Sequence, residues 1–354
     1  MGANVNNREL SIDGVRVADD TECYVIAEIG HNHQGDVEQA KKMIQAAAAA
    51  GANAAKLQKR DNRALFTKAY YDRPYASENS FGDTYGAHRE FLEFGEREYK
   101  ELQAFSKKIG IAFFATAFDF ESADFLASLN MPAFKVASGD LTNVPLIKYL
   151  ARFGNPLILS SGGGTLDDVD RAVKTLREVD AEYCMMQCTA GYPPAWEELN
   201  ISVISTFRER YPEAVVGFSS HDNGIAMAVA AHVLGARMVE KHFTLNRAMK
   251  GTDHAFSLEP QGLSKMVRDL RRLKLAIGDG VKRQYPSEKD PLTKMGKRVV
   301  AAKAIATGTV LAREHIAIKS PGGGTPAYRL DEMIGKRTKS ALEVDQDITF
   351  ENLS

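Results

Sequence analysis

The sequence predicts an α/β protein in which a (β/α)8 TIM barrel is followed by a small β-rich domain. Two observations indicate the barrel. Short apolar runs alternate with helical patterns over the first 245 residues, as they do when helices join parallel strands. These runs number eight, which favours closure of the sheet, and they are residues 24–30, 54–58, 112–118, 133–139, 156–162, 184–191, 215–221 and 238–244.

The alternative fold is an open doubly wound sheet with a dinucleotide site. Such a sheet carries a glycine-rich turn of the form G-x-G-x-x-G after its first strand. The text after the first run is GHNHQG, residues 30–35, which lacks that spacing. The barrel is therefore the preferred prediction.

Two of the connecting helices have clear start signals. Residues 36–51 begin with Asp36 as an N-cap, carry apolar side chains at helical spacing, and end at Gly51. A second helix begins at Thr165, with Asp168 as its capping partner and an apolar face over residues 169–176. Between the second run and its helix, residues 60–95 form a long insertion that we expect to be an ordered loop over the barrel mouth.

The chain is expected to divide into a catalytic barrel (residues 1–282), a linker (283–297) and a second domain (298–354). The linker is rich in Lys, Pro and Ser. The second domain contains two weak copies of one unit, at residues 304–318 and 341–353. A module this small has little core of its own, so we expect it to pack against another surface.

The composition excludes several classes of function. The 45 basic and 46 acidic residues leave a formal charge of -1, so the chain has no positive field for nucleic acid or an anionic membrane. Residues 1–14 contain no apolar signal region, and no run of 18 apolar residues occurs, so we expect a cytoplasmic protein. The three cysteines, Cys23, Cys184 and Cys188, are expected to be buried thiols.

Polar residues stand where the predicted strands end, which is where barrel enzymes place their chemistry. They are Glu28, Lys56, Thr116, Lys135, Ser138, Asp140, Ser160, Gln187, Tyr192, Ser219, His221, Glu240 and His242. Lys56 and Lys135 interrupt apolar strands, where an ammonium group needs an anion or a carboxylate. With hydroxyls close by, a bound phosphate, or a phosphate plus a carboxylate, is the preferred interpretation. The alternative is a buried ion pair with Glu28 or Glu240.

A metal site is expected at the ends of the seventh and eighth strands. His221 and His242 end adjacent strands, about 4.8 Å apart, so both imidazoles can reach one ion. Two nitrogen ligands leave positions for water and substrate, which fits Mn2+ or Mg2+ at least as well as Zn2+. His31 and His33 suggest an amidohydrolase, but the fifth and sixth strands lack the histidines that such a barrel needs. Asp253 lies in a polar loop expected over the same mouth.

Nine segments resemble the sialic acid synthase (N-acetylneuraminate synthase) family, and residues 298–354 resemble its C-terminal antifreeze-like (SAF) domain. The segments occur in order along residues 20–354. They are AEIGHNHQGD, AAKLQK, TYGAHREFLEF, FKVASGDLTN, ILSSGG, QCTAGYP, GFSSH, VEKHFT and KGTDHAFSLEP.

The resemblance implies condensation of phosphoenolpyruvate with the open-chain aldehyde of an N-acetylmannosamine-type sugar, with release of phosphate by C–O cleavage. It assigns the divalent ion, preferably Mn2+, to His221 and His242. It assigns phosphoenolpyruvate to Lys56, Thr116, Lys135, Ser138, Ser160 and Ser219. Glu28, Asp140, Glu240, Asp253 and Tyr192 would orient sugar hydroxyls, the water and the reacting carbon. The family also implies a homodimer in which each SAF domain covers the partner's barrel.

Three positions depart from many bacterial members of that family. Asp140 stands where they have Glu, and Ala190 stands where they have Asn, as in the animal enzymes that use a 6-phosphorylated sugar. Ser320 stands where they have an Arg that reaches the acyl group of the sugar. A 6-phosphorylated acceptor, or a precursor of legionaminic or pseudaminic acid, is therefore an alternative substrate.

Two hypotheses of other classes remain. Lys135 in a partly desolvated site could be the nucleophile of a Schiff-base aldolase. The antifreeze-like tail could be an ice- or ligand-binding module, although this would leave the polar strand ends of the barrel unexplained.

Overall fold

The structure is a computed structural model that describes residues 8–354. It contains two compact units, one that runs to Gly278 and one over Asp279–Ser354. The prediction about export rests partly on residues 1–7, which lie outside the described residues. Among the helices of residues 8–354, none combines the length and the apolar composition needed to cross a membrane.

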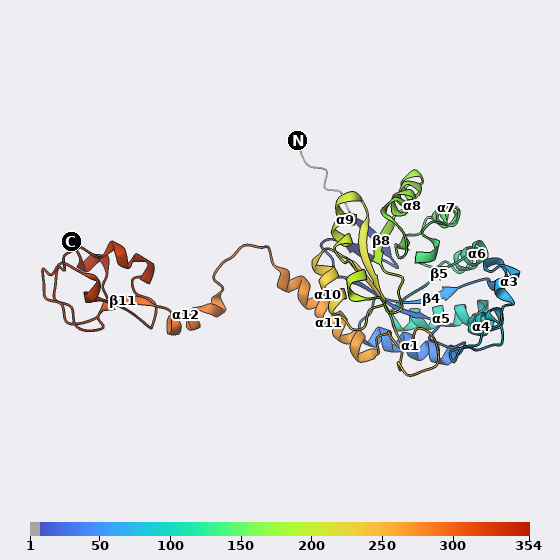
Figure 1. Cartoon of the computed structure of the whole chain (residues 1–354), viewed down its shortest axis with the longest axis horizontal. Helices are drawn as coiled ribbons and strands as arrows, with labels where there is room; N and C mark the ends of the chain where they lie inside the picture. The colour runs from blue at the N-terminus through green and yellow to red at the C-terminus, as the bar shows by residue number, and fades with distance from the viewer. Residues whose placement is uncertain (1–7) are drawn as a thin grey trace. The chain divides into compact units, whose positions relative to one another are not determined.

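The predicted barrel is confirmed. In the described part of the chain, eight parallel strands close in the order β10-β3-β4-β5-β6-β7-β8-β9. Figure 1 shows helices around the outside of these strands. The strands are β3 (Tyr24–Gly30), β4 (Ala54–Lys59), β5 (Ala112–Ala117), β6 (Phe134–Val136), β7 (Leu157–Ser160), β8 (Tyr183–Cys188), β9 (Val215–Ser220) and β10 (Met238–His242). Almost all of their residues are buried, because the wall packs against helices outside and side chains inside.

The helices follow the strands in the alternation that the sequence indicates. Asp36 caps α1 by accepting from the backbone N–H groups of Glu38 and Gln39, and Thr165 and Asp168 form the expected capping box of α8. The barrel helices are α1 (Val37–Ala49), α5 (Glu96–Ile109), α6 (Phe120–Ser128), α7 (Val144–Ala151), α8 (Leu166–Glu178), α9 (Val203–Arg210), α10 (Ala226–Val233) and α11 (Pro260–Ile277).

Several strands are shorter than predicted at their carboxyl ends. The sixth predicted run ends at residue 191, whereas β8 ends at Cys188, and the fourth ends at 139, whereas β6 ends at Val136. The chain turns out of the wall at these points, into a short 3-10 helix, η1 (Ser138–Asp140), after β6. Ser138 and Tyr192 consequently lie on loops after the strands, where side-chain direction is not fixed by the alternation of a sheet.

The insertion at residues 60–95 is more regular than the expected loop. It contains α2 (Asn62–Leu65), α3 (Lys68–Tyr71) and α4 (Tyr85–Leu92). Aromatic rings pack within it: the ring centroids of Tyr75 and Tyr85 are 5.4 Å apart, and those of Tyr75 and His88 are 4.8 Å apart. These edge-on and tilted contacts give the insertion a core that periodicity alone does not reveal.

An N-terminal hairpin was not predicted. Strands β1 (Glu9–Ile12) and β2 (Val15–Ala18) pair antiparallel, and Leu10, Ile12 and Val17 are buried in the main core. Just after the hairpin, Asp19 accepts two hydrogen bonds from Arg208, at 2.7 and 2.9 Å, and Arg237 lies at the amino end of β10. The hairpin therefore lies toward the amino ends of the strands, opposite the predicted site.

The second unit has its own small core. Strands β11 (Arg298–Ala301) and β12 (Ile316–Lys319) pair antiparallel, and ten buried apolar residues, among them Val299, Ile316 and Leu353, form one cluster. Both copies of the predicted repeat end alike, in short 3-10 helices, η4 (Arg313–His315) before Ile316 and η6 (Phe350–Asn352) before Leu353. The predicted linker contains η3 (Pro286–Glu288) and α12 (Lys289–Met295).

A buried ion pair connects the backbone next to the two predicted metal ligands. Lys241 Nζ donates to the Asp222 carbonyl at 2.6 Å and lies 3.0 Å from Asp222 Oδ1, and both residues are at most 2% exposed. Asp222 follows His221 and Lys241 precedes His242. The pair therefore ties the end of β10, which carries His242, to the loop after β9, which carries His221.

We predict that Lys241→Met lowers the free energy of unfolding by about 3–5 kcal/mol, because it leaves Asp222 as an unpaired buried charge. Urea denaturation followed by circular dichroism measures the change. Lys68→Met removes an exposed ion pair with Asp72 on α3 and serves as the control, with little expected effect. Equal destabilisation by the two substitutions would contradict the structural role of Lys241.

Candidate active site

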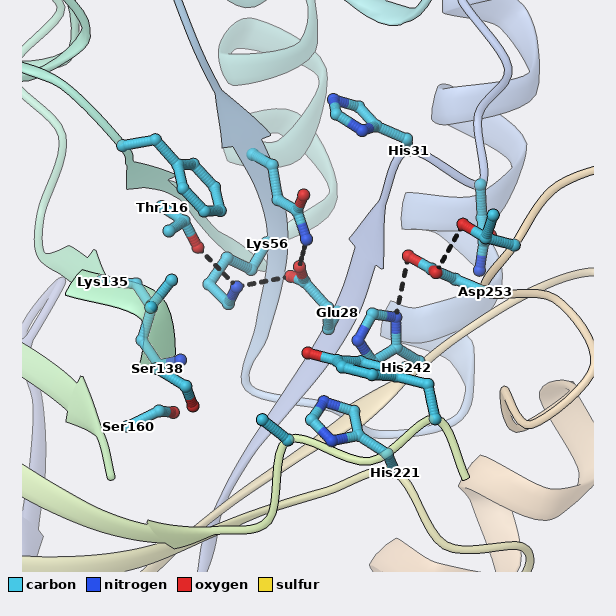
Figure 2. A pocket seen from close by; sticks show the side chains of 18 of the residues that line it. Glu28, His31, Lys56, Thr116, Lys135, Ser138, Ser160, His221, His242 and Asp253 are labelled. Carbon is cyan, nitrogen blue, oxygen red and sulfur yellow. Dashed lines mark hydrogen bonds and ion pairs between the residues drawn. The ribbon is translucent and has the colours of Figure 1, made fainter. Parts of the chain in front are cut away.

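The predicted site residues gather around a cavity at the carboxyl ends of the barrel strands. It has a volume of about 530 Å³ (Figure 2). Twelve of the thirteen residues to which the resemblance assigns a role line it: Glu28, Lys56, Thr116, Lys135, Ser138, Ser160, Tyr192, Ser219, His221, Glu240, His242 and Asp253. They come from all eight strands or their following loops, so barrel closure is what brings them together.

Asp140, the thirteenth, is not in the cavity wall, and neither is the strand-end residue Gln187, whose Nε2 donates to the Leu199 carbonyl at 3.1 Å. Asp140 ends η1, and its Oδ1 accepts from Asn143 Nδ2 at 3.1 Å, at the start of α7. Burial raises its pKa above the ordinary value for an aspartate. The turn after β6 directs Ser138 to the cavity and Asp140 away from it, so the proposed role of Asp140 finds no geometric support here.

Lys56 lies at the centre of one charged group. Its Nζ lies 2.6 Å from Glu28 Oε2 and donates to Thr116 Oγ1 at 2.9 Å, as Figure 2 shows. Gln58, two residues further along β4 and on the same face, donates to Glu28 Oε1 at 2.8 Å. Lys56 and Glu28 are each 1% exposed, so an unpaired charge on either would be costly.

Lys135 and Glu240 form a second buried pair. Lys135 Nζ donates to Glu240 Oε1 at 3.3 Å, and the same oxygen lies 3.6 Å from Lys56 Nζ. Burial would raise the pKa of Glu240, but Lys135, Lys56 and His242 more than offset it and hold the pKa below the usual value. The buried Lys–Glu pairing that the sequence left open is thus present, and one carboxylate lies between two ammonium groups.

Unsatisfied polar atoms line the wall beside Lys135. Ser160 Oγ and Glu240 Oε2 are buried and make no hydrogen bond within the described residues. Ser138 Oγ accepts from the Gly162 backbone N–H at 3.1 Å and lies 3.5 Å from Cys188 Sγ. A buried hydroxyl without a partner is costly unless a ligand or water completes it, so this side of the cavity is suited to an acceptor-rich anion.

His221 and His242 face each other across the cavity from the lysines. Their ring centroids are 5.3 Å apart, and the ring of Tyr192 lies 4.1 Å from that of His221. The Nδ1 of His221 lies 2.9 Å from the Thr189 carbonyl, which can accept only from an Nδ1–H and so leaves Nε2 as the free acceptor. Burial and His242 lower the pKa of His221 to about 3, which keeps the ring neutral.

The histidine pair fits a divalent ion. His242 Nδ1 is buried without a hydrogen-bond partner, and Asp253 Oδ2 lies 3.8 Å from it, too far for a hydrogen bond. In residues 8–354 no group of three or more His, Cys, Asp or Glu side chains could hold an ion by itself. The available donors therefore suit an ion that takes its other ligands from water and substrate.

Sequence analysis missed several lining residues, including Gln58, Arg60, Phe118 and Arg89. Gln58 could have been found, because it shares the inward face of its strand with Lys56. Arg60 and Arg89 belong to the insertion, whose path no periodicity predicts. His31 lines the cavity, whereas His33 stacks on Phe94 with ring centroids 4.1 Å apart and is 1% exposed. The two histidines therefore do not form a shared metal site.

Comparison with known protein families identifies the chain. Residues 43–282 match the NeuB family, and residues 297–354 match the SAF domain. The chain belongs to the NeuB family. This agrees with the resemblance found in the nine sequence segments.

Relatives and solved structures agree with this assignment. The chain is 39% identical to mouse N-acetylneuraminate-9-phosphate synthase over 94% of its own length and 92% of the mouse protein. It is 36% identical to N,N'-diacetyllegionaminic acid synthase of Campylobacter jejuni, over 91% and 97% of the two chains. A crystal structure of the N-acetylneuraminic acid synthetase of Leptospira borgpetersenii with citrate superposes with a TM-score of 0.69 at 31% identity, covering 82% of this chain and 96% of that one.

We predict that Glu240→Gln destabilises the protein by about 3–5 kcal/mol, because Lys135 loses its buried counter-charge. Added phosphoenolpyruvate should restore part of the loss, since an anion that binds the folded state stabilises it. Urea denaturation with and without phosphoenolpyruvate measures both effects. Glu96→Gln, which removes an exposed pair with Lys100, is the control. A Glu240 variant as stable as the parent would show that the buried pair is unimportant.

Proposed function

We propose that this chain is a sialic (nonulosonic) acid synthase. It condenses phosphoenolpyruvate with the open-chain aldehyde of an N-acetylmannosamine-type sugar and releases phosphate by C–O cleavage. One observation carries the proposal: in a NeuB-family barrel, two buried lysines and an unpartnered serine face a pair of histidines across one cavity. The names of the mouse and Campylobacter relatives support this class of reaction.

Phosphoenolpyruvate would bind on the lysine side of the cavity. Lys56 and Lys135 supply positive charge, and Thr116, Ser138, Ser160 and Ser219 supply hydroxyls to the phosphate and carboxylate oxygens. Glu28 and Glu240 pair with the lysines and orient them in the absence of substrate. Because these partners are already fixed, little reorganisation accompanies binding.

The histidine side would hold the metal ion and the sugar aldehyde. His221 and His242 would bind a divalent ion, Mn2+ in preference to Mg2+, which when bound polarises the aldehyde oxygen. Asp253, beside His242, and Tyr192, whose ring contacts that of His221, would orient sugar hydroxyls. Glu28, fixed by Gln58, lies between the two substrate positions and can hold a hydroxyl of the sugar.

In the overall reaction, one C–C bond forms, one water adds and one C–O bond breaks. C3 of phosphoenolpyruvate attacks the aldehyde carbon, and the aldehyde oxygen gains a proton to become a hydroxyl. Water adds at C2 and gives one proton to a carboxylate of the site. We assign this role to Glu240, because it is hydrogen-bonded to Lys135 on the phosphoenolpyruvate side of the cavity. The C2–O bond to phosphate then breaks as the water-derived hydroxyl at C2 loses its remaining proton and becomes a carbonyl, and inorganic phosphate leaves. The water thus supplies one proton to the aldehyde oxygen, through the carboxylate, and one to the phosphate.

We also propose that the enzyme is a cytoplasmic homodimer in which the SAF domain covers the partner's barrel. The SAF unit buries only a small apolar cluster, as expected of a module that packs against a larger surface. At the position of the family arginine, Ser320 Oγ accepts from Lys297 Nζ at 2.6 Å. Lys297 thereby brings a positive charge to the segment that is expected to approach the acyl group of the sugar.

The Schiff-base aldolase is the second candidate, because Lys135 is a buried lysine in a cavity. Its Nζ is engaged with Glu240, however, whereas a Schiff-base lysine has to act as a free amine. An ice-binding function of the tail leaves the cavity without a role. The synthase accounts for both the lysines and the histidines.

We predict that chelation by EDTA abolishes turnover and that Mn2+ restores it. His221→Ala should lose turnover by a factor of about 100 or more while its unfolding curve stays close to that of the parent. Binding of Mn2+, followed by electron paramagnetic resonance, should weaken in this variant. His315→Ala, on the SAF unit, is the control for removal of a histidine. Full activity in EDTA, or a covalent adduct of pyruvate trapped by borohydride, would instead support the aldolase.

We predict that deletion of residues 298–354 raises the KM for the sugar or eliminates activity, because the acceptor end of the site would lose its cover. Steady-state kinetics with phosphoenolpyruvate and Mn2+ test this, and circular dichroism of the truncated barrel shows whether it remains folded. A folded, fully active barrel fragment would contradict the covering role of the SAF domain.

A further inference from the structure

A cationic cluster lines the part of the cavity that neither the phosphoenolpyruvate residues nor the histidine pair occupies. It consists of Arg60, Arg89 and His31. Figure 2 shows His31 well apart from Lys135, Ser138 and Ser160, with Glu28 and Lys56 between them. The cluster therefore lies at the end of the cavity away from the expected phosphoenolpyruvate.

Both arginines are held in fixed orientations. The guanidinium of Arg60 stacks on Phe118, with Cζ 3.7 Å from the ring centroid, and its Nη2 donates to Gln58 Oε1 at 2.8 Å. Arg89 donates from Nε and Nη2 to the hydroxyl of Tyr85, at 3.0 and 2.8 Å. In each residue these contacts leave Nη1 as the nitrogen that points to the shared neighbour, His31.

The imidazole of His31 cannot satisfy both arginines. Arg60 Nη1 lies 3.3 Å from its Nε2, and Arg89 Nη1 lies 3.3 Å from its Nδ1. Burial, together with Arg60 and Arg89, lowers the pKa of His31 well below its ordinary value, so the ring is neutral and has one acceptor nitrogen. A guanidinium only donates, so one of the two arginines faces a ring N–H and lacks an acceptor there.

Two carboxylates, Glu93 and Asp253, lie near three cations, Lys59, Arg60 and Arg89, so they do not balance all of the positive charge. Glu93 lies 3.3 Å from Lys59 Nζ, 3.9 Å from Arg60 Nη1 and 3.2 Å from His31 Nε2, so two cations share it. Arg89 adds a further positive charge on the other side of the ring. Burial and Arg89 lower the pKa of Arg60 to about 10, which still leaves it protonated at neutral pH. Arg60 is 8% exposed, so its charge is scarcely screened by water.

We propose that Arg60, Arg89 and His31 bind a phosphate group at the end of the acceptor sugar away from its aldehyde, so that the acceptor is a hexosamine 6-phosphate. This inference rests on the proposed function, which places the aldehyde at the histidine pair. A phosphate dianion offers acceptors to both guanidinium groups at once and supplies the missing negative charge. A sugar hydroxyl or an acyl oxygen would leave that charge unbalanced.

The experiment compares N-acetylmannosamine 6-phosphate with N-acetylmannosamine in the full-length enzyme with phosphoenolpyruvate and Mn2+. The measured quantity is the ratio of the two kcat/KM values, from the rate of phosphoenolpyruvate consumption. We expect the wild-type enzyme to prefer the 6-phosphate by roughly 30-fold or more, as for one buried, hydrogen-bonded charge pair. Arg89→Gln and Arg60→Gln should each reduce this ratio by a similar factor, mainly through the KM of the phosphorylated sugar.

Two further variants separate charge from geometry and from position. Arg89→Lys keeps the charge but loses the planar fork, and should recover only part of the preference. Arg97→Gln removes an exposed arginine at the start of α5 and should leave the ratio unchanged. If the arginines only supported the fold, their replacement would lower turnover of both sugars in parallel and the ratio would not move.

The possible failures are distinguishable. A wild-type enzyme that uses both sugars equally, or only the unphosphorylated one, would overturn the phosphate site while leaving the synthase proposal intact. An unchanged ratio in both arginine variants would do the same. If the enzyme consumed no phosphoenolpyruvate with either sugar, the proposed function itself would be contradicted.

Discussion

The ion pairs of two buried lysines inside the barrel are the constraint on which the site depends. Lys56 and Lys135 lie within apolar strands, and their ammonium groups are tolerated because Glu28 and Glu240 lie 2.6 and 3.3 Å away. Each glutamate also touches a second group, Gln58 or Ser219. The same network that makes the folded chain stable therefore prepares a rigid cationic surface for an anionic substrate.

The closed barrel gives this cavity three chemically different regions. Lysines and hydroxyls lie along one wall, the pair of His221 and His242 faces them, and the arginines of the insertion lie beside His31. Each region suits one part of the proposed chemistry: phosphoenolpyruvate, the polarised aldehyde and the far end of the acceptor. The Lys241–Asp222 pair ties the two segments that carry these histidines together behind the wall, so support for the site extends outside the cavity.

The barrel and most of the site were predictable, because both follow from periodic features of the sequence. Lys56, Glu240 and His242 are polar interruptions of apolar strands, and in a barrel such residues have to meet at one end. Asp140, Arg60 and the N-terminal hairpin were not predictable in this way. Asp140 follows a turn that directs it away from the cavity, Arg60 lies where the chain enters the insertion, and the hairpin is two strands of four residues each. Their positions depend on tertiary contacts that no local pattern encodes.

The most direct test of the account is a crystal structure of the full chain with phosphoenolpyruvate and Mn2+, including anomalous data at the manganese edge. The account predicts one anomalous peak between the rings of His221 and His242, and phosphoenolpyruvate with its oxygens against Lys56, Lys135 and Ser160. Manganese bound elsewhere, or phosphoenolpyruvate outside the lysine wall with both Lys–Glu pairs undisturbed and no ligand at Ser160, would contradict it.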